Sequence, residues 1–124
     1  MNCRIKKEYP KIKVERKNKE VADILRYLYA SNKGFLTIIH QYLYETIVVS
    51  DEEVRVILKD LLLTEINHFE ILGKFIIELG STPVFATKDF GSEIYWNSDF
   101  IYYDRDIDTI VEINLEWTRI MIYN

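Results

Sequence analysis

Apolar residues recur every three or four positions along the chain from Asn18 to Val49, which is the spacing of one helix face. Asn18 is a suitable N-cap residue, and the sequence Asn32-Lys33-Gly34 allows a break or bend inside the pattern. We therefore predict a first helix over residues 18–49. Its core-facing stripe comprises Val21, Leu25, Leu28, Asn32, Phe35, Ile39, Tyr42, Thr46 and Val49.

A second stretch with the same periodicity follows after Ser50. The residues Asp51-Glu52-Glu53 supply a cap and two acids that suit the positive end of a helix dipole, and Gly80 is placed to end the helix. We predict a second helix over residues 51–80. Its stripe comprises Val54, Leu58, Leu61, Glu65, His68, Leu72, Phe75 and Leu79.

The remaining segments flank these two helices. Tyr9-Pro10 opposes a helix in residues 1–17, which we interpret as an extended arm with Ile12 and Val14 facing the bundle. Residues 81–105 are rich in turn formers and aromatic residues, and we interpret them as an irregular crossover loop. A third helix is predicted over 106–124, where it stops early without a capping residue.

Composition supports a single all-α domain over residues 1–124. Hydrophobic residues make up 48% of the chain, while only four glycines and two prolines interrupt it. The net charge is −4, and the basic residues of the arm alternate with acids, which argues against nucleic-acid binding. The single cysteine, Cys3, cannot form an internal disulfide, and we see neither a signal peptide nor a membrane span. We therefore expect a cytoplasmic protein.

Glu65 and His68 form a Glu-x-x-His pair on the predicted buried face of the second helix. Side chains three residues apart point the same way, so a carboxylate and an imidazole there could bind one metal ion. The alternative is that Glu65 and His68 lie by chance at the boundary between the core and the surface and bind no metal ion. Glu116 can point inward from the third helix, with Glu112 one turn earlier, while His40 is better explained as half-buried and bonded to a neighbouring helix.

Four stretches of the chain resemble the ferritin-like di-iron carboxylate superfamily, in particular its rubrerythrin-related bacterial branch. The Glu-x-x-His pair lies in the most specific of them. The four stretches are YPKIKV from Tyr9, LTIIHQYLY from Leu36, TEINHFEILG from Thr64 and YWNSDFIYY from Tyr95. The resemblance implies a helical bundle with ligands on four helices, namely an acid on the first and third and Glu-x-x-His on the second and fourth.

Carried over by position, the resemblance makes Glu65, His68 and Glu116 metal ligands for iron, manganese or zinc. The first-helix acid falls at Phe35, which cannot bind a metal, and the fourth helix is missing from the chain. Three of the six ligands of a di-metal site are then present. The site could therefore be partial, and the protein could also bind no metal at all.

Three functions fit this pattern. The first is a truncated or degenerate ferritin-like protein, which acts as a non-catalytic module and associates with itself to cover its apolar faces. The second is a metal-binding redox protein, with iron or manganese, whose site is completed between the subunits of a homodimer. The third is a mononuclear site made of Glu65, His68 and Glu116. Neither a substrate nor a redox partner is indicated by the sequence.

Overall fold

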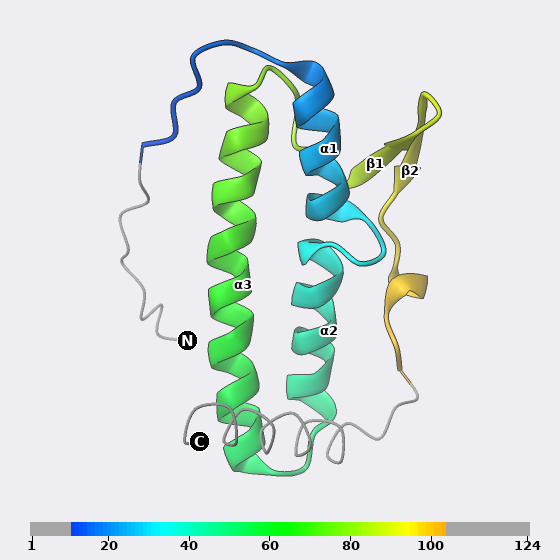
Figure 1. Ribbon diagram of the computed structural model, residues 1–124. Helices are drawn as coiled ribbons and strands as arrows, with labels where there is room; N and C mark the ends of the chain where they lie inside the picture. Colours follow the sequence, from blue (N-terminus) through cyan, green and yellow to red (C-terminus); the bar gives the residue numbers. More distant parts are fainter. Residues whose placement is uncertain (1–10, 104–124) are drawn as a thin grey trace, which may run out of the picture.

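The computed structural model describes residues 11–103, where three α-helices form the body of the molecule and a small β-hairpin lies beside them (Figure 1). In chain order the elements are α1 (Lys19–Ala30), α2 (Phe35–Val48), α3 (Glu52–Glu78), β1 (Ala86–Asp89), β2 (Ser92–Tyr95) and the short 3-10 helix η1 (Ser98–Phe100). Helices α1 and α2 follow one another along one side of the long helix α3 (Figure 1).

The predicted first helix is broken where the sequence allowed it, and the break separates α1 from α2. Gly34 is the N-cap of α2, and a Cβ atom there would lie 2.6 Å from the carbonyl oxygen of Leu28. The chain can pass that close to the end of α1 because residue 34 has no side chain. The hydroxyl of Thr37 donates to the carbonyl oxygen of Ser31 at 2.9 Å and holds the two helix ends together.

The predicted helix boundaries agree with the caps of the structure. The Asn18 side chain accepts from the Val21 amide at 3.1 Å, and the Asp51 side chain accepts from the amides of Glu53 and Val54. Gly80 has a φ of 95°, and the following amide of Ser81 donates to the carbonyl of Ile76 at 3.1 Å, which closes α3.

Two apolar clusters hold α1 and α2 against α3. The first lies at the α2–α3 connection and contains Val49, Val54 and Leu58. The second lies toward the other end of α3 and contains Tyr29, Ala30, Leu36 and Ile76. The Tyr29 ring stacks on Phe69 with ring centroids 4.0 Å apart.

The predicted core stripe of α3 is confirmed at Val54, Leu58 and Leu79 and was wrong at three positions between them. Val54 is buried, but the positions seven, fourteen and twenty-one residues later, which are Leu61, His68 and Phe75, are exposed. A strict seven-residue spacing drifts by about 20° per heptad around a straight helix, so these positions rotate progressively away from the core. Gly73 and Ile76 are buried instead.

The expectation of a mostly helical fold is confirmed for the described residues, whereas the expectation of an all-α chain with an irregular crossover was wrong over residues 86–95, which form an antiparallel hairpin. Its turn is made by Phe90 and Gly91, whose φ angles are 48° and 85°. The strand β1 packs on α1 and buries Ala86 and Thr87, whereas β2 is exposed along its length. The body of the described chain is still mostly helical.

A strap formed by residues 96–103 crosses back over α2. The Gln41 side chain donates to the carbonyl of Tyr102 at 2.9 Å and accepts from its amide at 2.8 Å. The Trp96 indole N–H donates to the Thr37 hydroxyl at 2.8 Å. These bonds fix the end of the described chain against the α2 side that faces away from α3 (Figure 1).

In the described part of the arm, Ile12 and Val14 are half-buried while Lys11, Lys13 and Glu15 are exposed, as the alternation predicted. The predicted third helix over 106–124 and the first ten residues lie outside the described residues. None of the helices within residues 11–103 is long and apolar enough to cross a membrane.

Candidate metal centre

Glu65 and His68 lie one turn apart in the middle of α3, as their spacing predicted. The Nδ1 atom of His68 is 3.7 Å from the Oε2 atom of Glu65, which is too long for a hydrogen bond but close enough for one ion to bind both. Glu65 is partly buried, with 20% of its side chain exposed. The two donors therefore converge.

His68 lies outside the core, contrary to the prediction that it shares the buried face. Its side chain is 52% exposed because position 68 has already rotated away from the helix face that carries Val54 and Leu58. The exposed imidazole can be hydrated by water, so it needs neither a buried partner nor a metal ion.

Phe35, the first residue of α2, lies against His68. The two ring centroids are 6.0 Å apart with an interplanar angle of 61°, an edge-to-face contact. The resemblance to di-iron carboxylate proteins expects an acidic ligand at this position. The contact shows that residue 35 faces the Glu-x-x-His pair, and its side chain there is a hydrocarbon ring without a donor atom.

Two residues that the sequence analysis did not single out, Tyr42 and Glu45, lie on α2 near Glu65. Burial raises the pKa of the Tyr42 phenol, and the negative charges of Glu65 and Glu45 raise it further. Glu45 is buried. The spacing of Gln41, Glu45 and Val49, four residues apart, was the available signal, because it places Glu45 on the same stripe as a buried valine.

His40 is half-buried, as expected, but it is bonded within its own helix and not to a neighbouring one. Its Nδ1 atom lies 2.8 Å from the carbonyl oxygen of Leu36, and its ring packs on Trp96 with centroids 4.3 Å apart. The strap of residues 96–103 packs on this side of α2. His40 therefore contacts the strap and is not part of the Glu65–His68 pair.

The donors of the described chain do not fit a di-metal centre. Within residues 11–103 no group of three or more His, Cys, Asp or Glu side chains is arranged to hold a metal ion. Glu116, the third predicted ligand, and Glu112 lie outside the described residues, so their predicted positions stay predictions. A carboxylate and an exposed imidazole are what this part of the molecule offers.

Comparison with known proteins identifies the fold through structure and not through sequence. No protein-family model and no curated protein sequence matches the chain. Two crystal structures of KatB, a manganese catalase from Anabaena, superpose on it with a TM-score of 0.75 at 19% sequence identity. The chain therefore shares the fold of these two structures.

The superposition covers 95% of this chain with one of the two KatB structures and 94% with the other. The chain spans 62% and 61% of the manganese catalase chains, so it matches less than two thirds of their length. At this identity the agreement shows that the arrangement of the elements is shared, and it leaves the chemistry to the residues of this chain.

Proposed function

We propose that this chain is a degenerate ferritin-like module that acts by associating with further copies of itself and does not catalyse a reaction. The observation that carries the proposal is the contact between the Phe35 ring and His68. By the resemblance, position 35 is where the ferritin-like di-metal arrangement has a carboxylate, and this chain has a hydrocarbon side chain there.

The number of donors supports the same conclusion. A ferritin-like di-metal centre uses a carboxylate from each of two helices and Glu-x-x-His from each of two others. Of the two described helices that face one another here, α3 supplies Glu65 and His68 and α2 supplies Phe35. A pair of metal ions would therefore lack the carboxylate ligand expected from α2, even if every other helix contributed its own ligands.

Self-association is supported by the apolar surface of the helices. Large apolar side chains are exposed on each of them, among them Ile24 on α1, Ile47 on α2 and Val56 on α3. Exposed apolar residues in this number favour a protein interface over contact with water. A second copy of the chain is the simplest partner because it is present at the same concentration.

Elemental analysis and sedimentation equilibrium together test the proposal. After expression in medium supplemented with iron, manganese and zinc, we expect a dimer or larger oligomer that contains no metal above background and does not dissociate in EDTA. A monomer at about 100 µM, or close to one metal ion per chain, would contradict the proposal.

A second candidate is a metal-binding redox protein, with iron or manganese, whose site is completed between subunits. The exposed ring of His68 favours it, because a donor from a second chain could reach that imidazole. The manganese catalase activity named for the structural neighbours makes manganese a natural choice of metal. This candidate predicts bound metal that is lost in both Glu65→Ala and His68→Ala, and an oligomer that dissociates when the metal is removed.

A further inference from the structure

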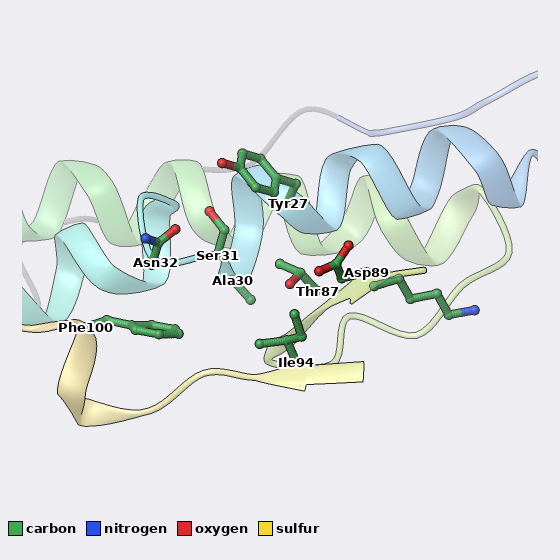
Figure 2. A pocket seen from close by; sticks show the side chains of 9 residues that line it. Tyr27, Ala30, Ser31, Asn32, Thr87, Asp89, Ile94 and Phe100 are labelled. Carbon is green, nitrogen blue, oxygen red and sulfur yellow. The ribbon is translucent and has the colours of Figure 1, made fainter. Parts of the chain in front are cut away.

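A hollow of about 320 Å³ lies between the end of α1, the α1–α2 connection, the hairpin and Phe100 (Figure 2). None of its lining residues belongs to α3, which carries Glu65 and His68, so the hollow is separate from the candidate metal centre. Its volume falls at the lower end of the range of small-molecule sites and suits a single substituted ring.

Apolar and aromatic side chains form part of the wall of the hollow. Tyr27 contributes from α1 and Ala30 from the last residue of that helix, while Ile94 and Phe100 point toward one another from the opposite side (Figure 2). The Phe100 ring is held in place by an edge-on contact with Trp96, with centroids 6.2 Å apart. An aromatic molecule between these side chains would replace water with ring contacts.

One polar group inside the hollow has no partner among the described residues. Thr87, on β1, is only 8% exposed, and its hydroxyl makes no hydrogen bond within residues 11–103. No described side-chain oxygen or nitrogen is both fully buried and unpaired, so this hydroxyl reaches solvent, and the hollow is the space that it lines. A mostly buried hydroxyl that has no partner among residues 11–103 can bind a polar group of a ligand.

The charges around the hollow balance one another. Lys88 and Asp89, which are adjacent on β1, are its charged lining residues, and both are exposed. The interior is formed by apolar side chains and by the uncharged groups of Ser31, Asn32 and Thr87. A charged ligand would lose its hydration there without gaining a buried counter-charge.

We propose that this hollow is a binding site for a small uncharged aromatic compound that carries an amide or hydroxyl group. The ring lies between Ile94 and Phe100, and the polar substituent exchanges a hydrogen bond with the Thr87 hydroxyl. The proposal is independent of the metal chemistry of Glu65 and His68.

The test is a titration of the ¹⁵N-labelled full chain. Benzamide and, separately, toluene are added, and the changes in the amide chemical shifts are recorded. Saturable shifts at Tyr27, Ser31, Thr87 and Ile94, with benzamide binding more tightly than toluene, are the expected result. Thr87→Val keeps the shape and strand preference of the side chain, and it should weaken benzamide about threefold to tenfold while leaving toluene unchanged.

Two further variants show whether benzamide and toluene bind in the hollow itself. Ile94→Trp adds a large side chain at an exposed lining position and should abolish the binding of both compounds. Tyr95→Trp, on the neighbouring position of β2 outside the hollow, is the matched control and should bind as the unmodified chain does. Absence of saturable shifts, unchanged binding in Ile94→Trp, or unchanged benzamide affinity in Thr87→Val would each overturn the proposal.

Discussion

At residue 35 a single side chain separates this molecule from one with a three-donor site. Phe35 begins α2, and its ring meets His68 edge-on. The fold already brings residue 35 to the histidine of the Glu-x-x-His pair. The identity of the side chain, and not the position of the helix, therefore removes the ligand.

Phe35→Glu should create a mononuclear site. A carboxylate at the first position of α2 also suits the positive end of that helix dipole, so we expect the variant to fold. We expect its affinity for Co²⁺ or Zn²⁺ to rise at least about tenfold, because three protein ligands with an open position form a working metal site. Isothermal titration and the visible spectrum of Co²⁺ measure the change.

Phe35→Gln is the control for this gain of affinity, because it introduces a polar side chain of the same size as glutamate without its charge. It should bind metal no better than the unmodified chain. Equal affinities for Phe35→Glu and Phe35→Gln would show that residue 35 does not reach an ion held by Glu65 and His68.

Among the elements, the attachment of the hairpin to α1 depends on one buried cation. Arg26 is 3% exposed, its Nε donates to the Ala86 carbonyl at 3.1 Å, and its guanidinium forms a bidentate pair with Glu93 on β2. This pair joins α1 to both strands. A two-stranded hairpin is marginal by itself in water, so the contacts with α1 account for its stability.

Glu93→Gln should destabilise the molecule at neutral pH and have little effect in acid. The hydrogen bonds from Arg26 lower the pKa of the Glu93 carboxyl below its ordinary value of 4.5. The stability from this pair is present above pH 4.5 and is lost as the pH falls through the lowered pKa. We expect a loss of about 1–2 kcal/mol at pH 7, measured by urea denaturation.

Glu70→Gln, at an exposed position of α3, is the matched control for Glu93→Gln and should be neutral across the same pH range. The curves of the unmodified chain and Glu93→Gln should converge once the pH is below the lowered pKa of Glu93, where both side chains are uncharged. A constant difference between them at every pH would mean that the variant loses packing and not the ion pair.

The helices and their caps could be predicted from the sequence because Asn18, Asp51 and Gly80 act through local backbone chemistry. The hairpin could not, since its turn places Phe90, and not asparagine or aspartate, before Gly91, and its strands are four residues long. The pair Glu65–His68 was predicted by spacing, but the exposure of His68 depends on how the straight helix drifts from a heptad pattern.

As a whole, residues 11–103 contain two apolar clusters with a polar residue between them. Val49, Val54 and Leu58 form one cluster with Tyr42 packed against it, and the second begins near Phe69, while Glu65 lies between them along α3. A bound metal ion would stabilise the charged Glu65 side chain between the two clusters. Without a metal this side chain interrupts a continuous apolar core.

Glu65→Leu should therefore be neutral or stabilising, by up to about 1 kcal/mol, because a partly buried leucine extends both clusters. The same change removes one of the negative charges that raise the pKa of Tyr42. Urea denaturation in the presence of EDTA measures the effect. A loss of more than about 1 kcal/mol under these metal-free conditions would show that Glu65 has a structural role that the apolar contacts of leucine cannot replace.

The short connection between α2 and α3 has a consequence for the order of folding. Only three residues separate these helices, so their pairing closes a small loop, whereas Arg26 meets its partners across 60 and 67 positions of the chain. Closing the longer loops costs more conformational entropy, and contacts between distant positions slow folding. The α2–α3 pair should form early and the hairpin should dock last, so hydrogen exchange in the native protein should be fastest in β1 and β2 and slowest in the facing turns of α2 and α3.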